Sequence, residues 1–187
     1  AAGVTTAHEG ATHAAELALM QRAAKSGGYV IDVIAYPFIT ELEAVLKDNP
    51  VSGWQKYDNR LKIGGVKITI DGSPQGKTAF FTKPYLTGGP GGEKDWSGEL
   101  MAPQEVVNKA VKAVYDLNVP LNLHANGDGA IDAFIKAEEA AAAAALPAAA
   151  RGEVELDAAD GVLVGFHRVA LAGHARGRRR ARVSRRR

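Results

Sequence analysis

The stretch LNLHANGDGAID, residues 121–132, places a short apolar run, a histidine and a Gly-rich turn in immediate succession. Its pattern predicts a strand over 119–124 and a helix that begins at Ala130. His124 then ends the strand, either as a simple polar group or as a metal ligand or acid/base. Asp128 lies in the turn, where it either caps the following helix or holds an active-site partner by a hydrogen bond.

Similar strand and helix patterns precede this stretch along the chain. We expect strands over 3–7, 29–38 and 61–72, helices over 12–25, 39–49 and 103–117, and a long loop over 73–98. Alternating strands and helices favour a parallel sheet covered by helices. An open doubly wound sheet and part of a (β/α)₈ barrel both fit this order. Both place functional groups at the carboxyl ends of strands, where we expect His8, Asp71 and His124.

Lys67 is an unusual residue for its place in the sequence, because it stands between Val66 and Ile68 in a strand that should be largely buried. Burying an ammonium group is costly unless the group is paired or modified. Lys67 therefore either reaches solvent from the alternate face of the strand or has a lowered pKa. An amine with a lowered pKa can form a Schiff base, or a carbamate whose two oxygens can bridge two metal ions.

Composition and charge divide the chain into two parts. Residues 1–150 hold 13 Lys+Arg and 17 Asp+Glu, a net charge of −4, whereas 151–187 hold 10 Arg and 4 Asp+Glu, a net charge of +6. There are no cysteines, which excludes disulfides and Cys-ligated zinc. No apolar run approaches the roughly 20 residues that span a membrane, so we expect no membrane partner.

We expect a first domain over 1–146 and an Arg-rich tail over 147–187 that is disordered or is a frameshifted reading of GC-rich DNA. Eight of the last twelve residues are Arg, which is a composition that can bind nucleic acid. The tail has no Lys, and no aromatic residue interrupts its last twelve positions. We therefore do not expect nucleic acid as the partner.

Three segments in order carry a family resemblance: GVTTAHEGAT (3–12), GGVKITIDGSPQGKTAFFTKPY (64–85) and LNLHANGDGAIDAFIKAEEA (121–140). They resemble the amidohydrolase superfamily and, more narrowly, the amidohydrolase 3 branch, which includes N-substituted formamide deformylase-like enzymes. That branch has a strand of the form V-K-x-x-x-D-G-S, then T-A and P-Y in a loop, and later H-A-x-G-D. The resemblance covers roughly residues 1 to 146.

The resemblance implies a metal-dependent TIM barrel, of which this chain holds about strands 2 to 5 or 6. It also implies one or two divalent ions, typically zinc, that activate water. Lys67 resembles the bridging lysine of the fourth strand, and His124 the metal ligand of the fifth. His167 is the candidate for the sixth-strand ligand. With Asp128, Lys67 and His124 form our set of candidate catalytic residues.

The expected function is hydrolysis of non-peptide carbon–nitrogen bonds, such as those of small amide-type substrates. No H-x-H pair occurs in the chain, and a whole barrel of this kind needs about 250 residues. We therefore expect a truncated, inactive fragment of an amidohydrolase. The alternative is a non-catalytic regulatory or binding module that retains half of the barrel. The sequence leaves the formation of a homo-oligomer undecided. We take the cytoplasm as the default compartment because no signal peptide is visible.

Overall fold

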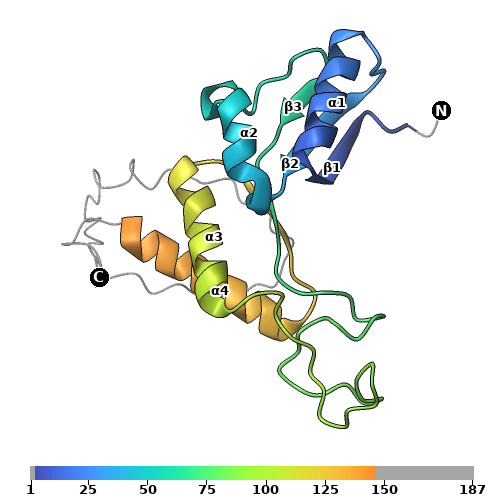
Figure 1. Ribbon diagram of the computed structural model, residues 1–187, viewed down its shortest axis with the longest axis vertical. Helices are drawn as coiled ribbons and strands as arrows, with labels where there is room; N and C mark the ends of the chain where they lie inside the picture. The colour runs from blue at the N-terminus through green and yellow to red at the C-terminus, as the bar shows by residue number, and fades with distance from the viewer. Residues whose placement is uncertain (1–2, 146–187) are drawn as a thin grey trace, which may run out of the picture.

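The computed structural model describes residues 3–145 of the chain, so His167 and the predicted tail over 147–187 lie outside the described residues. Its elements alternate between strands and helices, as the sequence predicts (Figure 1). In chain order they are β1 (Thr6–Thr12), α1 (Ala14–Lys25), β2 (Asp32–Pro37), η1 (Ile39–Glu41), α2 (Leu42–Asp48), η2 (Val51–Gly53), β3 (Leu61–Ile63), β4 (Val66–Thr69), α3 (Gln104–Leu117), β5 (Leu121–His124) and α4 (Asp128–Ala145).

All the paired strands run parallel, in the order β1-β2-β3 in one sheet and β4-β5 in another. A parallel bridge between Phe38 and Lys67 links the two sheets, because Phe38 directly follows β2 and Lys67 belongs to β4. The segment that contains β3 and β4 therefore runs alongside β2 and continues to β5. The described strands form a small mixed α/β arrangement that does not close on itself.

The prediction of one strand over 61–72 was wrong, because the structure has two shorter strands there, β3 and β4. Ala35 pairs with Ile63, and Phe38 pairs with Lys67. The segment from Ile63 to Lys67 is therefore one residue longer than the segment from Ala35 to Phe38 beside it. An extra residue of this kind is a β-bulge, and it changes which residues face each side. Before the bulge the odd-numbered Leu61 and Ile63 are buried, whereas after it the even-numbered residues of β4 are.

Two glycines form this bulge because other parts of the fold approach them closely. A Cβ atom on Gly65 would overlap the carbonyl group of Pro120, and one on Gly64 would overlap the side chain of Ile34. Gly65 also has a φ of +155°, which residues with a Cβ rarely adopt. The bulge therefore turns Lys67, rather than Val66, away from the core.

The first strand begins and ends later in the sequence than predicted, and the placement of His8 at its carboxyl end was wrong. β1 begins at Thr6 and continues to Thr12, so His8 lies within the strand, opposite Ile34 of β2. The pairing with β2 continues through the polar residues that follow His8, and Glu9 is in register with Ala35. The ring of His8 lies 5.6 Å from that of Tyr36.

Helices cover one face of the strands and bury an aliphatic core. In Figure 1, α1 and α2 lie against β1 to β3, while α3 and α4 cross next to each other below them. The core combines side chains from strands and helices, among them Leu17, Ala35, Val45, Val66, Ile68, Val107, Val111, Val114, Ala130 and Phe134. Because Val66 and Ile68 place one face of β4 in this core, the alternate residues of β4 lie on its opposite face.

The predicted long loop is confirmed, since no helix or strand lies between β4 and α3. It is drawn in green at the bottom of Figure 1, beyond the helices. Backbone hydrogen bonds join its two arms, from Phe81 N–H to the Ser97 carbonyl (2.7 Å) and from Tyr85 N–H to the Trp96 carbonyl (2.8 Å). Among residues 3–145, no helix is long and apolar enough to cross a membrane.

Candidate functional site

Lys67 and His124 lie on neighbouring strands and on the same face of them. In the β4-β5 pair, Lys67 is opposite Asn122 and Thr69 is opposite His124. Residues in register on parallel strands point to the same side, and so do residues two apart on one strand. The structure thus brings the two predicted residues to one face, with His124 nearer the carboxyl end.

The ammonium of Lys67 is half-buried and makes no hydrogen bond or ion pair with any described residue. Removing a charged amine from water disfavours its charged form, and this burial lowers the pKa of Lys67. A lowered pKa raises the fraction of uncharged amine near neutral pH. This direction agrees with the interpretation of Lys67 as a reactive lysine, which stays a prediction.

His124 is in contact with polar groups that follow β4 and β5. Its Nε2 lies 3.2 Å from the Gly72 carbonyl oxygen, 3.0 Å from Asn126 Nδ2 and 3.8 Å from Asp71 Oδ1. The side chain is 36% exposed, so the ring is partly open to solvent. His124 is held at the strand end through Nε2, which leaves Nδ1 without a hydrogen bond to the described residues.

Asp71 is a residue whose role the sequence interpretation missed. Its side chain is fully buried, and its carboxylate accepts three backbone N–H groups, from Phe80 (3.0 Å), Asn126 (2.9 Å) and Gly127 (2.8 Å). These donors satisfy a group that would otherwise be very costly to bury. Asp71 joins the start of the long loop to the turn after His124, and a carboxylate directly after an alternating strand was the available signal.

Asp128 is the first residue of α4 and fastens the long loop to this helix. Its two oxygens accept hydrogen bonds from the backbone N–H (2.8 Å) and the hydroxyl (2.6 Å) of Thr82. Oδ1 also accepts the N–H of Gly129 at 2.9 Å. The Thr82 hydroxyl is the largest cause that lowers the pKa of Asp128, followed by the Thr82 N–H. The catalytic role of Asp128 stays a prediction, and the described contact is with the loop.

A histidine–glutamate pair connects the ends of the first two strands. His13 Nδ1 lies 2.5 Å from Glu41 Oε1, and the other Glu41 oxygen accepts the N–H of Ala14 at 2.6 Å. The hydrogen bond between them raises the pKa of His13 and lowers that of Glu41. The His13 side chain is exposed and that of Glu41 is half-buried, so this pair fixes the junction after β1 rather than forming an enclosed site.

A complete set of metal ligands is not present in the part of the chain that the structure describes. Within residues 3–145, no three His, Cys, Asp or Glu side chains are grouped to hold a metal ion. Lys67 and His124 supply at most two donors, and the third predicted ligand, His167, lies outside the described residues. The described residues therefore fit a divalent ion only in part.

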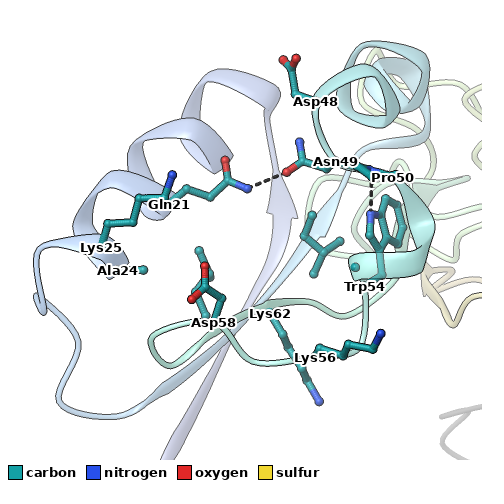
Figure 2. A pocket seen from close by; sticks show the side chains of 13 residues that line it. Gln21, Ala24, Lys25, Asp48, Asn49, Pro50, Trp54, Lys56, Asp58 and Lys62 are labelled. Carbon is teal, nitrogen blue, oxygen red and sulfur yellow. Dashed lines mark hydrogen bonds between the residues drawn. The ribbon is translucent and has the colours of Figure 1, made fainter.

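The structure has a pocket of about 330 Å³ at the opposite end of the strands (Figure 2). Its walls come from the carboxyl ends of α1 and α2, from Trp54 and from β3. None of Lys67, His124 and Asp128 lines it. The pocket is thus separate from the predicted site, at the end of the strands that in barrels contributes to stability.

Two solved structures resemble this chain. An uncharacterized metal-dependent hydrolase from Pyrococcus furiosus is 26% identical, with a TM-score of 0.63 over 75% of this chain and 28% of that chain. An uncharacterized metal-dependent hydrolase from Pyrococcus horikoshii OT3 is 28% identical, with a TM-score of 0.62 over 73% of this chain and 27% of that chain. The chain therefore spans less than a third of the length of either structure.

No curated protein matches the sequence. The sequence does match the model of the amidohydrolase family over residues 1–181, which is nearly its whole length. This match agrees with the order of the elements, with the parallel pairing of the strands and with the two similar structures. The chain belongs to the amidohydrolase family.

Proposed function

We propose that this chain is part of a metal-dependent hydrolase that cleaves carbon–nitrogen bonds in small amide-type substrates. The observation that carries the proposal is the common face of Lys67 and His124 on the neighbouring strands β4 and β5. In (β/α)₈ barrels, catalytic residues come from the carboxyl ends of several strands. The parallel strands and family membership support placing β1 to β5 in part of such a barrel.

Lys67 is proposed to act after modification by carbon dioxide. The uncharged amine attacks the carbon of CO₂, a nitrogen–carbon bond forms, and the nitrogen loses a proton to give a carbamate anion. The lowered pKa of Lys67 favours this step because it increases the reactive, uncharged amine. The carbamate oxygens would be ligands for a divalent ion, for which we propose zinc.

His124 is proposed as a second ligand, since a neutral imidazole nitrogen is a common metal ligand. A bound divalent ion would lower the pKa of a water molecule and polarise a substrate carbonyl. The long loop between β4 and α3 is fastened at this end by Asp71 and Asp128. Both carboxylates are proposed to shape the substrate side of the site.

Zinc binding by the full chain tests this proposal. We expect zinc, titrated in bicarbonate buffer and followed by calorimetry, to bind the parent chain at least about tenfold more tightly than the Lys67→Ala or His124→Ala variant. Lys62→Ala is the matched control, because Lys62 lies before the bulge with its ammonium 4.7 Å from the Tyr57 ring centre. Equal zinc affinity in all four proteins would contradict the proposal and favour a non-catalytic module.

A further inference from the structure

The described strands leave two outer edges without a partner. The strands occupy four positions, namely β1, β2, the segment that holds β3 and β4, and β5, and every pair runs parallel. Within residues 3–145, β1 pairs only with β2, and β5 pairs only with β4. An open strand edge presents N–H and C=O groups that can pair with a further strand.

The row of strands is curved, because its first and last members approach each other through one face. A Cβ atom on Gly10 of β1 would lie 3.4 Å from Nδ2 of Asn122 on β5. Neighbouring strands lie about 4.8 Å apart, so three steps across a flat sheet would separate β1 from β5 by about 14 Å, which is too far for this contact. Asn122 is in register with Lys67, so the inner face of the arc is the face of Lys67 and His124.

The two helices that flank the open edges carry exposed apolar side chains and opposite net charges. Leu19 on α1 is 57% exposed, and Ile131 and Ile135 on α4 are 44% and 46% exposed. On the described helices the one other exposed large apolar side chain is Val106 of α3. α1 holds one Glu, one Arg and one Lys, a net charge of +1, whereas α4 holds four Asp+Glu and one Lys, a net charge of −3. The two helices lie far apart in Figure 1, so neither covers the other within one copy.

We propose that two copies of this chain associate around a two-fold axis, with β5 of each copy paired in parallel to β1 of the other and α4 of each packed against α1 of the other. Four strand positions from each copy make the eight of a closed barrel. The two-fold axis makes both junctions identical. Residues 146–187 are too few to form four further strand and helix units of the size seen in 3–145. This inference goes beyond the proposed function and requires no bound metal.

Sedimentation equilibrium of the full chain without added metal tests the assembly. We expect a mass twice the 19.7 kDa of one chain. Ile135→Lys places an ammonium against the basic helix α1 and should weaken the dimer at least about tenfold. Val106→Lys is the matched control, since Val106 is 50% exposed on α3, and it should leave the dissociation constant unchanged. A monomeric parent chain, with residues 146–187 or solvent covering the edge of β5, would overturn the proposal.

Cross-linking tests which helices meet, and the chain has no cysteine that would interfere. Leu19→Cys and Ile135→Cys chains, unfolded in urea and refolded together, should be joined by a short bismaleimide into a covalent dimer. Leu19→Cys alone should stay unlinked, because the two-fold axis places the two α1 helices on opposite sides of the barrel. Val106→Cys mixed with Leu19→Cys is the control and should also stay unlinked. Linkage of Leu19→Cys to itself, or no linkage in the first mixture, would contradict the proposed arrangement.

Discussion

The two ends of the strands use their polar residues differently. At the carboxyl end, Asp71 and Asp128 accept hydrogen bonds from residues up to 56 positions away in sequence. At the amino end, most polar contacts of the pocket are local, such as Lys56 with the carbonyl of Ser52, four positions away. Long-range polar contacts are thus concentrated where the loops that follow the strands meet, which is the end that bears function in barrel folds.

The largest effect should come from a methyl group added at the carboxyl end. A Cβ on Gly127 would overlap the backbone of Phe80, whereas a Cβ on Gly53 beside the pocket would meet nothing within 4 Å. We expect Gly127→Ala to lower the free energy of unfolding by about 3 kcal/mol and Gly53→Ala to change it by less than about 0.5 kcal/mol. Urea denaturation measures both, and equal effects would remove the contrast between the two ends.

The second largest effect should come from replacing the buried carboxylate of Asp71. Asp71→Asn replaces one accepting oxygen with an NH₂ group that faces backbone N–H donors, so we expect a loss of about 2 kcal/mol in the free energy of unfolding. Asp58→Asn beside the pocket is the matched change, and we expect less than about 0.5 kcal/mol because this residue is exposed. Thermal unfolding of the two variants compares them directly, and a greater loss in Asp58→Asn would contradict the comparison.

A smaller effect is expected where the loop joins α4. Thr82→Val removes the hydroxyl that lowers the pKa of Asp128, so we expect this pKa to rise toward its ordinary value of 3.8 in an NMR titration. A lowered folded-state pKa stabilises the fold above the unfolded-state pKa, and this contribution is lost as the pH falls through the folded-state value. The stability difference between parent and variant should therefore be present at neutral pH and vanish in acid.

The matched control for this change is Thr87→Val. Thr87 belongs to the same loop, and its hydroxyl makes no hydrogen bond to a described residue. We expect the Asp128 pKa to be unchanged in this variant. An unchanged pKa in Thr82→Val as well would mean that the hydroxyl does not contribute to the environment of Asp128.

Local patterns were sufficient to predict the order of the elements and the long loop. The alternation in VKITI and the apolar stripe of residues 103–117 each depend on neighbours close in sequence, and both produced elements near the predicted positions. The interruption at Gly64 and Gly65 was missed because its cause is the close approach of Ile34 and Pro120. Such contacts depend on the packing of distant segments.

The candidate site, like the fold, was predictable only in part. Strand ends and alternation singled out Lys67 and His124, and parallel pairing places them on one face. The role of Asp71 was missed because its three donors are 9, 55 and 56 positions away in sequence. Its place directly after an alternating strand was the available signal, and that signal does not show which backbone groups the carboxylate binds.

Lys67, turned to the face of His124 by the glycine bulge, is proposed to form a metal-binding carbamate. ¹³C NMR of the full chain with zinc in ¹³C-labelled bicarbonate detects such a carbamate directly. We expect a carbamate signal in the parent chain and in Lys62→Ala that disappears in Lys67→Ala. A spectrum without the signal, or a signal that persists in Lys67→Ala, would contradict this proposal.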